Sequence, residues 1–105
     1  EKPMATTLKD AADIVNASDS YSSFLQIGLQ YRYKAQYIEA FQEVQSRGSI
    51  GTIKTISMSE YRPPVLDKVG QWNKFNKNTG GTLVERCCHY FDLMNCAADA
   101  KPKKV

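Results

Sequence analysis

The sequence predicts an α/β protein in which helices separate the strands of a parallel sheet. Residues 24–33 alternate apolar and polar side chains, as a strand with one buried face does. Residues 52–62 are rich in β-branched side chains and stop at Pro63-Pro64, which predicts a second strand. Residues 35–47 have apolar side chains at helical spacing. Because parallel strands need a crossover connection, this order predicts one βα unit of a larger sheet.

Another helix is expected before the first strand. Pro3 disfavours helical geometry at the residue before it, so the chain should begin as an extended loop. Thr6 or Thr7 can cap the helix that follows, with Asp10 three residues after Thr7. The polar residues 16–20 should end this helix. Its predicted apolar stripe consists of Leu8, Ala11, Ala12 and Val15.

The middle of the chain continues in the same order. The helix predicted for residues 35–47 should end at Gly48, which can take the left-handed backbone conformation of a C-terminal cap. Residues 65–79 have no clean period and predict an ordered loop or a short helix before the Gly80-Gly81 turn. One face of the first strand should carry Leu25, Ile27, Leu29, Tyr31 and Tyr33.

The third predicted helix, residues 83–97, contains the only histidine of the chain. At 100° per residue, its residues Glu85, His89, Asp92 and Cys96 fall within about 60° of one another. Apolar side chains occupy most of the remaining circumference, so we expect the helix to be packed on nearly all sides. The polar stripe must then meet partners, a ligand or a water-filled cleft.

Two kinds of chemistry fit this stripe. Either carboxylate, Glu85 or Asp92, could orient the His89 imidazole or hold a substrate hydroxyl while the imidazole moves a proton. Spacing alone leaves open whether the three residues form such a site or a structural cluster. A zinc site is disfavoured, because Cys87 and Cys88 point 100° apart on a helix and the chain has no C-x-x-C pair.

Composition excludes several classes of protein. The 105 residues suffice for one small domain, and no apolar run approaches the length of a membrane span. The net charge of +3 comes largely from the tail Lys101-Pro102-Lys103-Lys104, which predicts a solvated tail and not a nucleic-acid site. Three cysteines cannot all pair, so we expect reduced thiols and a cytoplasmic protein. Residues 102–105 could start a further strand.

Four short motifs, taken together, resemble those of the glucose–fructose oxidoreductase and inositol dehydrogenase (Gfo/Idh/MocA) family. The resemblance covers essentially all 105 residues. In chain order the motifs are Glu1-Lys2-Pro3, Gly28-Leu-Gln-Tyr-Arg32-Tyr33, Gly48-Ser-Ile-Gly51-Thr-Ile, and Gly80-Gly81-x-Leu-x-Glu85-x-x-x-His89-x-x-Asp92.

The resemblance implies an oxidoreductase that transfers a hydride between NAD or NADP and a secondary alcohol of a sugar or polyol. It further implies the end of a Rossmann-type parallel sheet domain in residues 1–33, followed in residues 34–105 by the first part of a C-terminal α/β domain with an open sheet. The chain starts without methionine and contains no G-x-G-x-x-G turn, so we expect an internal fragment with that turn upstream. The full-length protein is expected to form a homo-oligomer and to bind neither nucleic acid nor membrane.

The resemblance also implies roles for individual residues. Lys2, His89 and Glu85 would be catalytic, with His89 as the acid/base and Lys2 as a hydrogen-bonding and proton-relay group. Substrate would contact Asp92, Gln30 and Arg32; the cofactor would contact Glu1, Lys2 and Pro3; no residue would bind a metal. Glu85 stands where many members have Asp.

That departure leaves a second interpretation open, in which the protein is a non-catalytic, ligand-sensing relative of the same fold. A third interpretation, an independent small basic module that binds a partner or nucleic acid, depends only on the charge of the tail.

Overall fold

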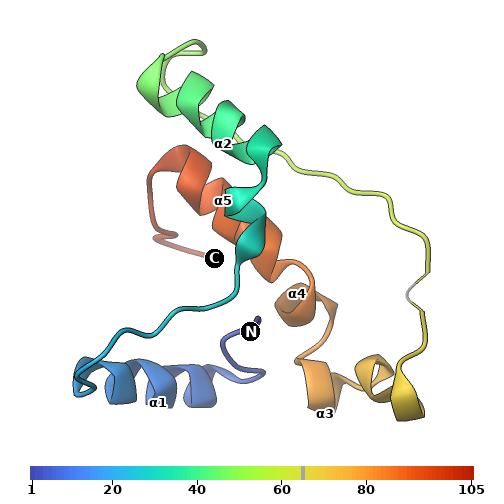
Figure 1. Cartoon of the computed structure of the whole chain (residues 1–105). Helices are drawn as coiled ribbons and strands as arrows, with labels where there is room; N and C mark the ends of the chain where they lie inside the picture. The colour runs from blue at the N-terminus through green and yellow to red at the C-terminus, as the bar shows by residue number, and fades with distance from the viewer. Residues whose placement is uncertain (65) are drawn as a thin grey trace. The chain divides into compact units, whose positions relative to one another are not determined.

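The computed structural model describes residues 1–64 and 66–105, and it divides into two compact units. One unit comprises Glu1–Leu29 and Pro63–Cys88, and the other comprises Gln30–Arg62 and His89–Val105. The elements along the chain (Figure 1) are α1 (Leu8–Asp19), η1 (Gln30–Tyr33), α2 (Ala35–Phe41), η2 (Gln42–Ser46), η3 (Val69–Lys74), α3 (Asn76–Thr79), α4 (Thr82–Glu85) and α5 (Cys88–Ala98).

The predicted α/β fold class is wrong for the described residues, which contain helices and no strand. Neither the Rossmann-type sheet nor the open sheet is therefore present there. The first predicted strand, residues 24–33, is irregular up to Leu29 and then becomes the 3₁₀-helix η1. The second, residues 52–62, and the terminal segment 102–105 have no regular structure.

The reason is that alternation assigns side chains to two faces but does not provide a neighbouring strand for the backbone to pair with. In residues 24–33 the backbone bonds locally and, at Gly28, to Glu1. The Leu29 N–H donates to the Ile27 carbonyl at 2.8 Å, a three-residue turn that interrupts the extended chain. The proposed domain boundary between residues 33 and 34 stays a prediction.

The first predicted helix is confirmed as α1, and so is its cap. Thr7 Oγ1 accepts a hydrogen bond from the Asp10 N–H at 3.1 Å and donates one to the Asp10 carboxylate at 2.7 Å. Its predicted apolar stripe is not buried. Leu8 is 88% exposed and Val15 is 44% exposed, so this helix contributes little to a core.

The second predicted helix is also confirmed, with an irregular last turn. It begins as α2 and continues without a break into the π-helical turn η2. Gly48 then has φ +62°, the left-handed conformation predicted for it, and its neighbours leave open space around it.

The third predicted helix is interrupted and less buried than expected. The N–H groups of Arg86 and Cys87 both donate to the Thr82 carbonyl, at 3.0 and 3.2 Å, which closes α4 before α5 begins. On α5 only His89 and Leu93 are buried, whereas Phe91 is 49% exposed. The expectation of a continuous helix packed on nearly all sides is therefore wrong.

Residues 66–79 contain η3 and α3, which agrees with the predicted loop or short helix; Val65, the first residue of that prediction, lies outside the described residues. Gly80 and Gly81 follow with φ of +71° and +87° and lead directly into α4. Within residues 1–64 and 66–105, every helix is too short or too polar to cross a membrane.

Candidate functional site

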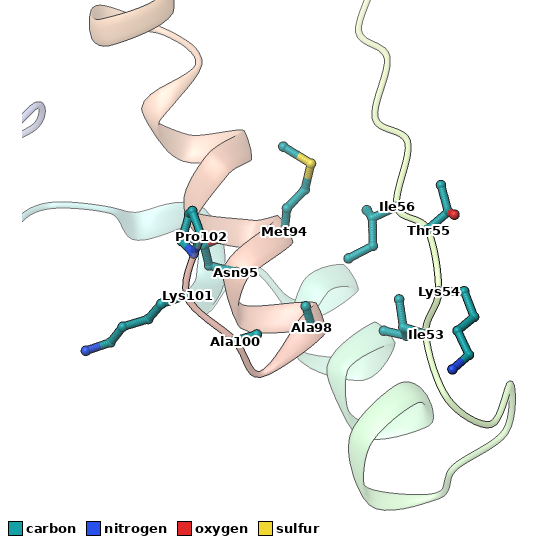
Figure 2. Close-up of a pocket in the computed structure, with 10 residues that line it drawn as sticks. All are labelled: Ile53, Lys54, Thr55, Ile56, Met94, Asn95, Ala98, Ala100, Lys101 and Pro102. Atoms are coloured by element: carbon teal, nitrogen blue, oxygen red, sulfur yellow. The ribbon is translucent and has the colours of Figure 1, made fainter. Parts of the chain in front are cut away.

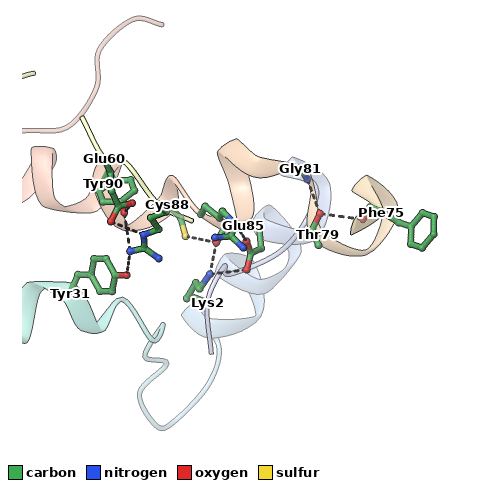
Figure 3. Close-up of polar contacts among 11 residues, drawn as sticks. Lys2, Tyr31, Glu60, Phe75, Thr79, Gly81, Glu85, Cys88 and Tyr90 are labelled. Carbon is green, nitrogen blue, oxygen red and sulfur yellow. Dashed lines mark hydrogen bonds and ion pairs between the residues drawn. The ribbon is translucent and has the colours of Figure 1, made fainter. Parts of the chain in front are cut away.

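Lys2 and Glu85 are 83 positions apart in the sequence and meet in the first unit. Lys2 Nζ donates to the Glu85 backbone carbonyl and to Glu85 Oε1, the latter at 3.2 Å (Figure 3). The other carboxylate oxygen, Oε2, lies 3.2 Å from Arg86 Nε. The side chains of Lys2 and Glu85 are 21% and 25% exposed. The carboxylate is thus held between two cations, and water still reaches all three groups.

Backbone contacts hold the start of the chain where Lys2 can reach Glu85. The Gly28 N–H donates to the Glu1 carbonyl at 3.2 Å. A Cβ atom at Gly28 would lie 3.3 Å from Glu1 Cα, so this close approach favours glycine at this position. The Lys2–Pro3 peptide bond is cis. On the other side, Glu85 is the last residue of α4.

A polar cavity of about 230 Å³ adjoins Glu85 within the same unit. Its wall contains amide, hydroxyl and charged groups from η3, α3, α4 and the residues that flank α4. The lining residues are Asn73, Lys74, Asn76, Thr79, Gly81, Thr82, Glu85 and Arg86. Such a wall offers hydrogen-bond donors and acceptors to a small hydroxylated molecule.

His89 is the second residue of α5 and is 6% exposed. Its ring stacks on Tyr31, with the two centroids 3.9 Å apart and the planes 7° from parallel. Tyr31 belongs to η1. The Lys34 ammonium lies 3.7 Å from the Tyr31 centroid, and Arg62 donates a hydrogen bond to the Tyr31 hydroxyl (Figure 3). The predicted acid/base residue is therefore buried against an aromatic ring.

Arg32 and Asp92 form a two-pronged ion pair in the second unit. Arg32 Nε donates to Asp92 Oδ2 at 3.0 Å, and Arg32 Nη2 donates to Oδ1. The Asp92 side chain is only 11% exposed and that of Arg32 is 39% exposed. These hydrogen bonds to Asp92 raise the pKa of the Arg32 guanidinium. Each oxygen of Asp92 thus accepts one hydrogen bond from Arg32 and can accept another.

The remaining predicted site residues take part in neither of these ion pairs. Gln30 opens η1 with an exposed side chain, Glu1 is exposed and Pro3 is half-buried. The prediction that Glu85, His89, Asp92 and Cys96 form one polar stripe on a single helix is wrong, because Glu85 belongs to α4 and the other three to α5. The structure thus brings Lys2 to Glu85 and Arg32 to Asp92, each pair within one unit.

Tyr31 is the functional candidate that the sequence analysis did not select. It was assigned only to a strand face, although it lies between Gln30 and Arg32, both of which the family resemblance singled out. The ring that stacks on His89 comes from a residue 58 positions earlier, so no helical spacing could reveal the contact. The signal that could have drawn attention to Tyr31 was its position inside one of the family motifs.

The cysteines form no disulfide, and the described residues contain no cluster of three histidine, cysteine or acidic side chains suited to a metal. Burial raises the pKa of the Cys96 thiol, and the nearby Asp92 carboxylate adds to that effect. A second cavity, of about 330 Å³, lies in the second unit between residues 53–56 and the C-terminal end of α5 (Figure 2). It contains none of the predicted site residues.

Comparison with known proteins places these residues in a family of oxidoreductases. Residues 44–105 match the model described as the oxidoreductase family, C-terminal alpha/beta domain (GFO_IDH_MocA_C). The match covers more than half of the sequence, so the chain belongs to the Gfo/Idh/MocA oxidoreductase family, as the motifs indicated. The sheet that gives that domain its description is not present in the described part of this chain.

One curated relative is the "Putative oxidoreductase YteT" of Bacillus subtilis (strain 168). It is 27% identical over 107 aligned residues, which cover 100% of this chain and 25% of that protein. The chain therefore spans about a quarter of the length of this relative.

Proposed function

We propose that this chain supplies acid–base residues to an NAD(P)-dependent dehydrogenase that oxidises a secondary alcohol of a sugar or polyol. Membership of the oxidoreductase family supports the class of reaction. The observation that carries the proposal is the contact of Lys2 with Glu85, because it joins two residues that the family motifs select independently. The polar cavity beside Glu85 supports a hydroxylated substrate.

Oxidation of a secondary alcohol needs a group that accepts the hydroxyl proton and a cation near the oxygen as negative charge develops. His89 is the proposed acceptor, since an imidazole changes its protonation state near neutral pH. The Lys2 ammonium is the proposed cation, and Glu85 fixes its position. Asp92, held by Arg32, and Gln30 are proposed to contact further substrate hydroxyls.

The residues present fit one end of the cofactor only. A cation such as Lys2, at a mostly buried position that water still reaches, suits a place beside a nicotinamide and substrate. The sequence has no G-x-G-x-x-G turn, and the first turn of α1 carries the Asp10 carboxylate, which would repel a phosphate. When bound, NAD or NADP would accept the hydride.

The test is to replace Lys2 by alanine in the complete protein that carries this chain. We expect turnover with polyols to fall by roughly 10²-fold or more, because the oxygen loses its neighbouring cation. Lys101→Ala is the matched control, since it removes an equal charge from an exposed position. Both variants should melt at similar temperatures.

Near-normal turnover of Lys2→Ala would refute the proposed role of Lys2. If the unaltered protein binds cofactor and sugar but transfers no hydride to or from any of a broad panel of polyols, the protein is a ligand-sensing relative instead.

A further inference from the structure

Tyr31 lies at the centre of the second unit's polar and aromatic contacts. The centroid of the His89 ring lies 3.9 Å from that of Tyr31, and the Lys34 ammonium lies 3.7 Å from the same Tyr31 centroid. Two groups so close to one centroid would collide on the same face, so they occupy opposite faces. The Tyr31 ring is therefore clamped between a cation and the imidazole.

Contacts around its rim fix the ring further. Arg62 donates to the Tyr31 hydroxyl, and the same guanidinium forms an ion pair with Glu60 at 2.6 Å. The rings of Tyr37 and Tyr90 lie 6.4 and 6.2 Å from that of Tyr31, the first nearly parallel to it and the second edge-on. Tyr31 is thus held on both faces, at its hydroxyl and at its edges.

A rigid aromatic face can set the orientation of a ring that packs on it. The terminal torsion of a histidine side chain has a broad minimum, so backbone position alone does not fix the plane of the imidazole. With a 7° angle between the two planes, stacking on Tyr31 does fix that plane. Proton transfer depends steeply on such geometry, and a displacement of about 1 Å can cost 10²-fold in rate.

We infer that Tyr31 is a positioning residue that orients the His89 imidazole for proton transfer. The inference rests on the proposed function, because it assumes that His89 moves the hydroxyl proton. We attribute the orientation of the imidazole to the aromatic face of Tyr31 and not to its hydroxyl.

The experiment compares variants of Tyr31 in the complete protein, with a polyol as substrate and nicotinamide reduction as readout. Tyr31→Phe keeps the face and should retain kcat within about twofold. Tyr31→Leu removes the face and should lower kcat about tenfold or more, with KM changed much less. Tyr61→Leu is the matched control, since it removes a tyrosine ring that is 98% exposed, and it should leave kcat nearly unchanged.

A second measurement does not depend on activity. With histidine labelled at its ring carbons, NMR should show the His89 ring protons shifted upfield by the stacked ring in the unaltered protein and in Tyr31→Phe. This shift should be lost in Tyr31→Leu. Tyr31→Met serves in place of Tyr31→Leu if the leucine variant does not fold.

Three outcomes would overturn the inference. Unchanged kcat in Tyr31→Leu, in a protein that oxidises polyols, would refute it and leave the proposed function standing. An equal loss in Tyr31→Phe would assign the effect to the hydroxyl bonded by Arg62. Absence of polyol oxidation in the unaltered protein would refute the proposed function and the inference together.

Discussion

At the scale of single residues, charge pairing decides how the candidate groups are held. Glu85 contacts the cations Lys2 and Arg86 but remains a quarter exposed, so water screens these pairs and each contributes little to stability. The pair with Lys2 instead determines geometry, because Glu85 restricts where the Lys2 ammonium can lie. Asp92 is more buried, and the loss of Arg32 would leave its carboxylate without its main partner.

Cys96 provides a test of the surroundings of Asp92. Burial and the Asp92 carboxylate raise the pKa of its thiol, so less thiolate forms at a given pH than for an ordinary cysteine. We expect alkylation of Cys96 by iodoacetamide to reach its half-maximal rate at a higher pH than for a cysteine peptide. Peptide mapping by mass spectrometry over pH 7 to ~10 measures this.

Asp92→Asn removes one of the causes that raise this pKa and should move the profile of Cys96 back to lower pH. A profile that matches the peptide already in the unaltered protein would contradict the partly buried environment assigned to this thiol.

At the scale of elements, local signals predicted the first two helices correctly, whereas the continuity of the third helix and both predicted strands were wrong. Thr7 with Asp10 identified the start of α1, and Gly48 identified the end of η2, because caps and left-handed glycines act within a few residues. Alternation in residues 24–33 carried no information about a pairing partner. The break at Arg86 was missed because apolar periodicity continues across it.

Gly80, the C-terminal cap of α3, illustrates how the end of an element depends on a single residue. It has φ +71°, and a Cβ atom there would lie 2.8 Å from the Thr6 carbonyl oxygen and 2.9 Å from Val84 Cγ1. Gly80→Ala should therefore lower the free energy of unfolding by about 2 kcal/mol or more, from both backbone strain and overlap. Thermal or urea denaturation of the complete protein measures the change.

The matched control is Gly48→Ala, which has a similar φ of +62° but open space around the added Cβ atom. This variant should lower the free energy of unfolding by only about 1 kcal/mol, from backbone strain alone. Equal losses for the two variants would show that the approach of Gly80 to Thr6 and Val84 is not tight.

The motifs selected residues that lie together in the structure, whereas the predicted fold class was wrong. The motifs named Lys2, Glu85, Arg32 and Asp92, and the structure joins them in two pairs, although their chemical roles remain predictions. Tyr31 also lies inside one of these motifs, but nothing in the motif distinguished it from its neighbours. Its contact with His89 arises from the packing of η1 against α5, which local sequence does not encode.

At the scale of the whole molecule, the chain belongs to an oxidoreductase family and spans about a quarter of the length of its relative YteT. Activity, substrate, cofactor and assembly are therefore proposals about the complete protein. Within that protein, this chain is proposed to contribute proton transfer and charge stabilisation near the substrate. The G-x-G-x-x-G turn that grips a dinucleotide is not part of its sequence.

The central claim is that His89 accepts the substrate's hydroxyl proton. The most direct test is single-turnover reduction of the nicotinamide by a polyol, with the complete protein in excess over cofactor. His89→Ala should slow this step by roughly 10²- to 10⁴-fold. The control Phe91→Ala, from a half-exposed position on the same helix, should leave it within about twofold. A rate for His89→Ala equal to that of the control would contradict the account.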